Sequence, residues 1–445
     1  MSTPAANDSM TDSSTTPPAS RLRAAIGPGL LMAGAAVGVS HLVQSTRAGA
    51  EYGLALIALV LLGCLLKFPF LEFGPRYAAA TGESLVAGYR RMGRWALGLF
   101  TLITLSTMFI VTAAVTLVTA GLTGELLGLD LSATALSTGV LGACGLLLAL
   151  GHYRTLDRVM KLIMAGLALV TVVAVGLALT SLVGQPAAID RLGESVLHER
   201  LWTATTFAFV LALLGWMPIP LDAAAWHSLW TLERARQTGH RPTLREASFD
   251  FHVGYLGATL LAVAFLLLGA LTMYGTGSDF AGGAVAFAGQ FADLYGAALG
   301  EGWRPLIVTA ALATMFSTTL TVVDAFPRVL RAVLEDAADA DERRAAEDPG
   351  HRARYLASLA IIAIGALVVI DRFGGSFTQL IDFITTVSFL AAPIIAWLNL
   401  RLLTGPWTPA AARPGPALRA LAWTGLAFLV ALSAIWIGGR MLGAD

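Results

Sequence analysis

Apolar segments long enough to cross a lipid bilayer recur throughout this chain, and they constrain its fold more than any other feature. Only 13% of the 445 residues are charged and 56% are hydrophobic, whereas soluble domains contain about 25% charged residues. A helix needs about 20 apolar residues to cross the hydrocarbon core. We therefore expect an all-α membrane protein with 11 transmembrane helices, over residues 24–46, 54–78, 95–121, 133–151, 157–183, 202–231, 251–274, 303–333, 353–371, 376–402 and 417–440, and an amphipathic helix near 282–298.

The first apolar segment is interrupted halfway. It begins as Gly27-Pro28-Gly29 and reaches Gly38-Val39-Ser40-His41 before it continues. An unpaired polar group in hydrocarbon costs several kcal/mol, so polar interruptions of this kind line a cavity or contact protein. The pattern predicts a broken helix whose gap, around residues 37–41, holds a solute.

The sixth apolar segment is interrupted in the same way. Gly215-Trp216-Met217-Pro218-Ile219-Pro220 carries two prolines, which remove two backbone donors and cannot lie in a regular helix. Interrupted segments at matching places in two halves indicate a transporter built from inverted repeats with a site at the midplane. The expected domains are a disordered cytoplasmic tail (1–20) and a transmembrane transporter domain (21–441), which comprises repeat one (24–183, helices 1–5), repeat two (202–402, helices 6–10) and an extra helix (417–440).

Basic residues predict the orientation in the membrane. Arg21 and Arg23 precede the first helix, and further arginines lie at every second connection. Lys and Arg are enriched on the cytoplasmic side, so we expect the N-terminus in the cytoplasm and the C-terminus outside, in a bacterial-type inner membrane. Residues 1–20 lack the apolar core of a signal peptide. Membrane lipids are the expected partners. The zero net charge gives no support for nucleic acid, and the sequence leaves the oligomeric state open, with a monomer as the simplest form.

Several motifs resemble the Nramp (natural resistance-associated macrophage protein) family. They are GPGLL and AGAEYG on either side of the first break, Met217-Pro218, the run YRTLD at 153–157, the run LREA at 244–247, and Ser317-Thr318. The similarity extends over helices 1 to 10 almost without gaps. The resemblance implies the leucine-transporter fold, with broken helices 1 and 6 and ion-coupled alternating access. Nramp proteins carry divalent transition metals, usually with protons.

The chain departs from the family pattern at the metal site. The family signature Asp-Pro-Gly-Asn is replaced by Gly38-Val39-Ser40-His41, and Met-Pro-His is replaced by Met217-Pro218-Ile219. The acidic residues of the family's third helix are absent from residues 95–121. The sequence therefore resembles a divergent branch that lacks the metal-site motifs, and the transported solute is not expected to be a transition metal.

The remaining site favours a small anion. A broken helix offers free carbonyls at one end, which suit a cation, and free N–H groups at the other, which suit an anion. Without carboxylates, the N–H ends near Ser40–Val43 and Leu221–Ala223 dominate. Bicarbonate is the first candidate by size and hydrogen bonding. The expected substrate-binding residues are Gly38, Val39, Ser40, His41, Trp216, Met217, Pro218, Ile219 and Asp222.

An anion that enters a cell held negative inside requires a driving ion. Thr314, Ser317 and Thr318 have the one-turn spacing of the sodium site in this fold class, and helix-1 carbonyls near Ala36 and Val37 would complete the shell. Sodium accepts hydroxyl and carbonyl ligands without a carboxylate. We expect a Na⁺-coupled symporter with no cofactor other than bound Na⁺.

Other interpretations remain open. Asp222 and Met217 could instead hold a divalent metal such as Mg²⁺ or Mn²⁺, in a transporter without Nramp-type proton coupling. A sensor that binds without moving solute is a third hypothesis, whereas nothing in the sequence supports an enzyme.

Individual polar residues also have structural interpretations. His41 could be a packing histidine, and the Arg47–Glu51 spacing fits a helix-surface pair. Lys67 is expected to form an ion pair, with candidate partners Asp324, Asp382 and Glu72. Trp226 and His227 are expected to anchor helix 6 at the membrane interface.

Overall fold

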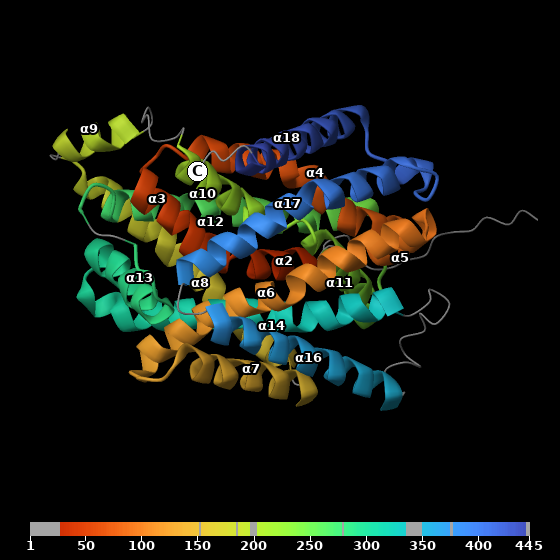
Figure 1. Cartoon of the computed structure of the whole chain (residues 1–445), viewed down its shortest axis with the longest axis horizontal. Coiled ribbons are helices and arrows are strands. Elements are labelled where there is room, and N and C mark those ends of the chain that lie inside the picture. The colour runs from red at the N-terminus through yellow and green to blue at the C-terminus, as the bar shows by residue number, and fades with distance from the viewer. Residues whose placement is uncertain are drawn as a thin grey trace, which may run out of the picture.

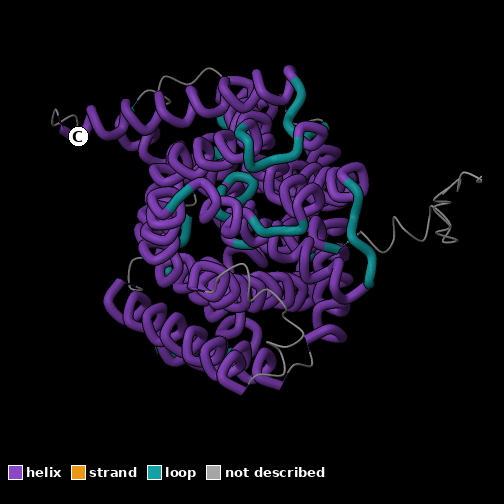
Figure 2. The backbone as a smooth tube through the Cα atoms, turned by 90° about the vertical axis from the view of Figure 1, so that its right-hand side faces the viewer, coloured by secondary structure: helices purple, strands orange, loops and turns teal. Residues whose placement is uncertain are grey.

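The computed structural model describes residues 27–150, 153–183, 186–195, 203–277, 280–334, 349–373 and 377–441. In these ranges every regular element is a helix (Figure 2), and the helices lie side by side in an elongated bundle (Figure 1). The expected tail at 1–20 and most of the charged loop after residue 334 lie outside the described residues. The all-α prediction is confirmed.

The helices follow one another along the chain with short connections. In order they are α2 (Pro28–Ala36), η1 (Val39–Ser45), α3 (Thr46–Tyr52), α4 (Ile57–Thr81), α5 (Leu85–Met92), α6 (Arg94–Leu127), α7 (Ala133–Leu150), α8 (Tyr153–Ser181), α9 (Pro186–Ser195), α10 (Ala204–Trp216), α11 (Ala223–Thr238), α12 (Leu244–Thr272), α13 (Ala284–Leu299), η3 (Glu301–Trp303), α14 (Arg304–Leu334), α16 (Pro349–Phe373), α17 (Phe377–Thr404), η5 (Ala410–Ala412) and α18 (Pro416–Met441).

Among the described residues, eight helices are long and apolar enough to cross a membrane, or nine if the bent pair formed by α8 and α9 is one span. The first and sixth apolar segments are absent from that count because each is divided into shorter pieces. The prediction of broken helices is therefore confirmed for both segments. The total of 11 spans stays a prediction.

Local sequence signals explain several boundaries. α12 begins at Leu244, seven residues before the predicted start, because Thr243 and Glu246 form a reciprocal capping box at its N-terminus. The short helix α5 was not predicted; the Ser84 side chain accepts a hydrogen bond from the N–H of Ala87 and caps it. α4 ends at Gly82, which adopts a left-handed conformation.

The packing partners follow the predicted repeat. α12, the first full helix after the second break, packs against α2 and α3, and α4, the first full helix after the first break, packs against α10 and α11. One crossing is very tight: a Cβ atom on Gly49 of α3 would lie 1.9 Å from the carbonyl oxygen of Leu266 in α12. Small residues allow such close approach between membrane helices. Each broken helix is thus held by a long helix of the other repeat.

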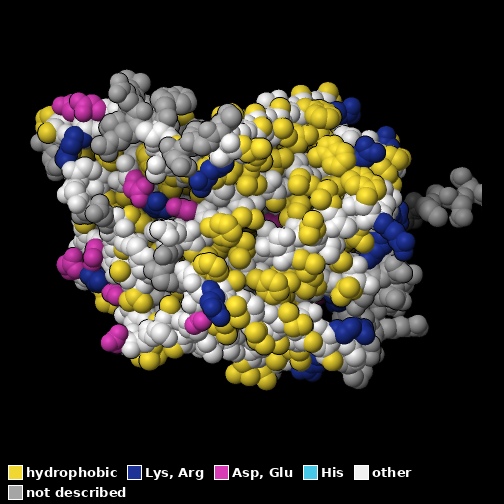
Figure 3. Space-filling model, viewed as in Figure 1, with side chains coloured by type: hydrophobic (Ala, Val, Ile, Leu, Met, Phe, Trp, Pro, Cys, Tyr) yellow, Lys and Arg dark blue, Asp and Glu magenta, His cyan; other side chains and the backbone are white. Residues whose placement is uncertain are grey.

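The surface carries an apolar band between two polar ends. On the face shown in Figure 3, basic side chains gather at the end where α5 lies and acidic side chains gather toward α9 and α13. The first of these ends includes Arg90 and Arg91, and the second includes Asp190, Glu194 and Asp293. A band of this kind suits an integral membrane protein. Which end faces the cytoplasm stays a prediction.

Candidate functional site

The first helix breaks at Val37 and Gly38. α2 ends at Ala36, and the chain turns sharply, with the N–H of Gly38 donating to the carbonyl of Ala36 at 2.7 Å. A Cβ atom on Gly38 would lie 2.8 Å from Cγ2 of Thr318 in α14, so only glycine allows this close contact. The gap is narrower than the predicted 37–41, because Val39 already begins the wide π-helical turn η1.

Ser40 and His41 are joined by hydrogen bonds just after this break. The Ser40 hydroxyl lies 2.6 Å from the Ala36 carbonyl oxygen and 2.9 Å from His41 Nδ1. His41 Nε2 lies 2.8 Å from the carbonyl oxygen of Ala258 in α12. Both ring nitrogens of His41 therefore have partners, and the ring ties η1 to α12. In the described part of the chain, the N–H groups of Val39 and Ser40 have no backbone acceptor, as expected for the first turn of a helix.

The second break covers the six residues between α10 and α11, Met217 to Asp222. The Trp216 indole donates to the Ser388 hydroxyl of α17 at 2.8 Å. Met217 Sδ lies 3.8 Å from the Ser45 hydroxyl of η1, so the two breaks meet directly. Asp222 occupies the N-cap position of α11 without forming a side-chain cap, and its Oδ1 atom is buried without a hydrogen-bond partner among the described residues.

A small cavity lies between the two breaks and is closed by α6 and α14. It is lined by Ala35, Val39, Ser40, Val111, Val115, Trp216, Ile219, Pro220, Trp226, Thr318 and Val322. None of these side chains is acidic or basic. No group of three or more His, Cys, Asp or Glu side chains able to hold a metal occurs within the described ranges.

Four of the nine predicted substrate-binding residues line this cavity, namely Val39, Ser40, Trp216 and Ile219. The other five lie behind it, in the backbone of the breaks or against neighbouring helices: Gly38, His41, Met217, Pro218 and Asp222. The sequence analysis missed Val111, Val115, Trp226 and Val322. Their spacing of one helical turn on α6 and α14 is also the spacing of lipid-facing or core residues, so the pattern alone cannot single them out.

The predicted sodium site forms a cluster of oxygens between α2 and α14. Thr318 Oγ1 lies 2.8 Å from the carbonyl oxygen of Gly34, 3.1 Å from that of Thr314 and 3.5 Å from that of Val37. The Ser317 hydroxyl makes no hydrogen bond to the described part of the chain, and the residue is buried. Ala36 differs from the expectation, because its carbonyl already accepts from Ser40 and from the N–H of Gly38.

The predicted ion pair of Lys67 is wrong. Each proposed acid is engaged elsewhere: Asp324 with Arg328 and Tyr355, Asp382 with Arg47 and Gln44, and Glu72 with Arg76 and Ser248. Lys67 Nζ instead lies 3.1 Å from each of the Leu214 and Gly215 carbonyl oxygens and 2.9 Å from that of Ile219. The open carbonyls of the helix-6 break, rather than a carboxylate, satisfy this cation.

Trp226 and His227 also differ from their predicted role as interfacial anchors. Both are buried, with exposed fractions of 2% and 0%. Trp226 packs against Phe326, and His227 lies 3.9 Å from the carboxylate of Asp250. The predicted Arg47–Glu51 pair is confirmed at 2.7 Å.

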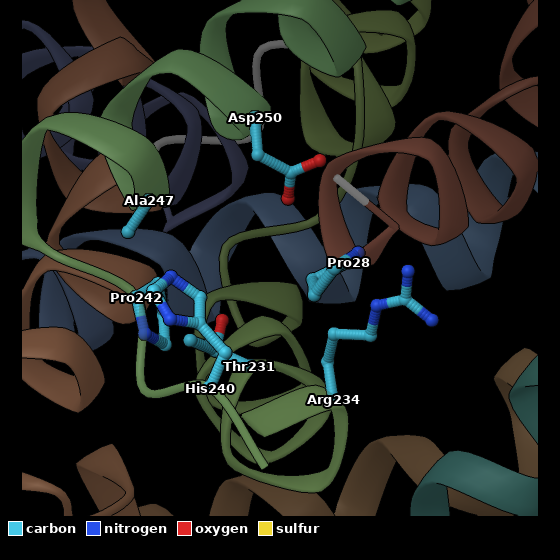
Figure 4. Close-up of a pocket in the computed structure, with 7 residues that line it drawn as sticks. All are labelled: Pro28, Thr231, Arg234, His240, Pro242, Ala247 and Asp250. Carbon is cyan, nitrogen blue, oxygen red and sulfur yellow. The ribbon is translucent and has the colours of Figure 1, made fainter. Parts of the chain in front are cut away.

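A second, smaller pocket lies where α2 begins. Figure 4 shows the Asp250 carboxylate of α12 pointing toward the start of α2, with Arg234 on the other side of Pro28. Asp250 Oδ1 accepts from the N–H of Gly27 at 2.9 Å, and Oδ2 accepts from the N–H of Gly29 at 2.6 Å. This carboxylate therefore holds the free N–H groups of α2.

Comparisons with known proteins agree with the resemblance seen in the sequence. The family model described as natural resistance-associated macrophage protein-like (Nramp) matches residues 29–438. An uncharacterized protein of Pasteurella multocida (strain Pm70) is 35% identical over 388 residues, which cover 85% of each chain.

Solved transporter structures share the fold. A mutant of the manganese transporter of Eremococcus coleocola superposes with a TM-score of 0.69 at 16% identity, covering 94% of this chain and 88% of that one. MHP1, a nucleobase-cation-symport-1 family transporter, superposes with a TM-score of 0.57 at 15% identity, covering 94% and 93%. These likenesses confirm the leucine-transporter fold. Because Nramp family members are transporters and not enzymes, the match over nearly the whole chain identifies this protein as a secondary transporter that belongs to the Nramp family.

Proposed function

We propose that this protein carries a small inorganic anion, with bicarbonate as the first candidate, together with Na⁺. The observation that carries the proposal is the cavity between the two breaks. Its lining contains no charged side chain, while the N–H groups of Val39 and Ser40 at its edge have no backbone acceptor in the described part of the chain. Free N–H groups at a helix N-terminus attract negative charge.

The donor set argues against a divalent metal as the solute. Mg²⁺ and Mn²⁺ prefer carboxylate, carbonyl and water oxygens, and desolvation of a divalent ion must be compensated by anionic ligands. The cavity offers the Ser40 and Thr318 hydroxyls, whose nearest acceptors belong to α2 and α14. An oxyanion, by contrast, needs only donors, and the breaks supply them.

The oxygen cluster around Thr318 supports sodium coupling. Three carbonyls lie within 3.5 Å of the Thr318 hydroxyl, and the Ser317 hydroxyl of the next position is available as a further ligand. These are neutral hard oxygens, the ligand type that a monovalent hard cation accepts. Thr318 also lines the solute cavity, so Na⁺ at this cluster would lie beside the anion and attract it. An anion that moves inward against a negative membrane potential needs about 2.3 kcal/mol per 100 mV, which co-transported Na⁺ offsets.

A divalent cation is the second candidate because two observations favour it. The similar solved structures include a manganese transporter, and Asp222 has a buried carboxylate oxygen without a hydrogen-bond partner among the described residues. In this alternative Asp222 and Met217 would approach the cavity after a rearrangement of the helix-6 break. The two candidates predict opposite signs of transported charge.

Flux through the purified protein in liposomes tests the proposal. Radiolabelled bicarbonate should accumulate at alkaline pH when a Na⁺ gradient points inward, and a K⁺ or choline gradient should not replace it. Protein-free liposomes correct for the permeation of CO₂. Uptake of Mn²⁺ or Mg²⁺ without any anion flux would overturn the anion proposal in favour of the metal. The Ser40→Ala variant should lose anion uptake, whereas Ser137→Ala, at a buried serine of α7, provides a matched control that should keep it.

A further inference from the structure

Lys67 lies in the middle of α4 and reaches into the second break. Its exposed fraction is 1%. Its Nζ atom lies within hydrogen-bond distance of three carbonyl oxygens, at 3.1 Å from Leu214 and Gly215 and 2.9 Å from Ile219. Three carbonyl acceptors require three N–H donors, which only the protonated ammonium group provides. The helix-6 break therefore contains a resident positive charge.

No carboxylate neutralises this charge directly. Within the described ranges no acidic oxygen lies within 4.0 Å of Lys67 Nζ, since the acids expected to pair with it have other partners. A charge in this position is expensive in a membrane protein, and intramembrane charges commonly mark the solute pathway. The carbonyls of Leu214 and Gly215 belong to the last turn of α10, where the helix dipole is negative. Lys67 thus caps the end of the break that would otherwise suit a cation.

Ile219 connects this cap to the solute cavity. Its side chain lines the cavity, and its carbonyl oxygen accepts from Lys67 at 2.9 Å. The ammonium group therefore holds this carbonyl away from the solute and compensates the two α10 carbonyls behind it. What remains directed toward the cavity is the N–H end of the first break.

We propose that Lys67 is a positioning residue that sets the sign of the transported charge, by occupying the carbonyl end of the helix-6 break and leaving only donors for the solute. This inference rests on the proposed anion transport. In a broken helix the carbonyl end and the N–H end compete to define the site. With the carbonyl end filled by a tethered cation, a free cation finds no ligands there, and an anion meets a net positive field.

The first experiment compares wild type with Lys67→Met in full-length protein reconstituted in liposomes. Methionine has similar length and no charge, so the three carbonyls lose their donor. The KM for the anion should rise at least about tenfold, because the positive field and the fixed Ile219 carbonyl are lost, while the KM for Na⁺ should stay within about twofold. A purely structural cap would lower the amount of active protein and therefore Vmax, and would leave both KM values unchanged.

Arg76→Met provides a matched control. Arg76 is a basic residue of the same helix that pairs with Glu72 at 2.8 Å and does not reach the break. Its removal should leave the anion KM unchanged even where stability falls. An equal rise in KM for both variants would overturn the role of Lys67.

A second variant tests the same inference by chemical rescue. Lys67→Ala lacks the propylammonium portion of the side chain, so added propylammonium should restore anion uptake, whereas propanol of the same size should not. This variant, prepared with propylammonium, replaces Lys67→Met should the latter fail to fold. On the wild-type protein, propylammonium and Mn²⁺ should not inhibit anion uptake, because the carbonyls are already occupied. Competitive inhibition by either cation would overturn the inference without any variant.

The outcomes separate the inference from the proposed function. Absence of anion flux in the wild type would refute the function itself. Normal anion flux with the same KM in Lys67→Met would refute the role of Lys67 and leave the function standing.

Discussion

Arg47 of α3 and Asp382 of α17 form an ion pair at 2.7 Å that joins the two repeats. Gln44 of η1 strengthens the link, because its amide donates to the other Asp382 oxygen at 3.1 Å. The Arg47 guanidinium also lies 4.7 Å from the ring centre of Phe209 in α10. The α3 half of the first broken helix is therefore attached to α10 and α17, and any opening of the cavity toward this end must break the Arg47–Asp382 pair.

The Asp382→Asn variant should make the cavity more accessible from the α3 end. A hydrogen bond to a charged group contributes about 1.5–3 kcal/mol, and about 1.4 kcal/mol corresponds to a tenfold change in population. We expect about a tenfold faster reaction of a membrane-impermeant thiol reagent with a Val115→Cys reporter in the cavity, added from the α3 end. The native cysteines, Cys64 and Cys144, are buried and are replaced by alanine in this background.

Glu51→Gln is the control for this prediction. Glu51 pairs with the same arginine at 2.7 Å, but both residues lie on α3 and the Glu51 side chain is 32% exposed. A local surface pair contributes about 0.3–0.5 kcal/mol. Reporter labelling should change by less than threefold, and an effect as large as that of Asp382→Asn would contradict the assignment of the pair as a link between repeats.

Asp250→Asn should loosen α2 at the other end of the same broken helix. The carboxylate accepts hydrogen bonds from the N–H groups of Gly27 and Gly29, and loss of such a cap costs about 0.5–2 kcal/mol. Hydrogen exchange measured by mass spectrometry should become faster for α2 peptides, by up to about tenfold, and remain unchanged for α3. Asp293→Asn, which alters an exposed pair with Arg304 in α13, should leave both regions unchanged. Faster exchange in α3 as well would show general destabilisation instead.

The broken helices were predictable because their cause is local. Two prolines at Pro218 and Pro220 and the polar run after Gly38 interrupt otherwise apolar segments, and backbone chemistry alone forbids a regular helix there. Boundaries were less predictable. The start of α12 depends on a capping box, and the narrow first gap depends on the contact between Gly38 and Thr318, which are 280 residues apart in the chain by their numbering.

The partners of Lys67 were not predictable from the sequence. An isolated lysine in an apolar segment suggests a carboxylate partner, since side chains are visible in a sequence and free carbonyls are not. Its actual acceptors become available only because α10 ends at Trp216 beside α4. His227 shows the same limit: its position near a helix end suggested the interface, but the packing of Phe251 buries it.

Thr318→Val should weaken the dependence on Na⁺. The substitution keeps the shape of the side chain and removes the hydroxyl that lies among the Gly34, Val37 and Thr314 carbonyls. We expect the KM for Na⁺ in the uptake assay to rise about tenfold or more, because one ligand is lost and the methyl group faces the carbonyls. Thr321→Val, one turn further along α14, removes a hydroxyl that bonds only to the Ser317 carbonyl and should leave the KM for Na⁺ unchanged. A change of the same size in both variants would point to α14 packing instead of ion binding.

Asp222→Asn distinguishes the two candidate solutes most directly. The Asp222 carboxylate is buried at 6% exposure, and one of its oxygens lacks a hydrogen-bond partner among the described residues. A metal site would need its negative charge, so Mn²⁺ binding measured by isothermal titration calorimetry would be abolished in the variant. The anion proposal predicts the opposite: the wild type binds no Mn²⁺, and removal of a nearby negative charge leaves the anion KM unchanged or lowers it. Saturable Mn²⁺ binding to the wild type that disappears in Asp222→Asn would therefore refute the anion proposal and assign the site to a divalent cation.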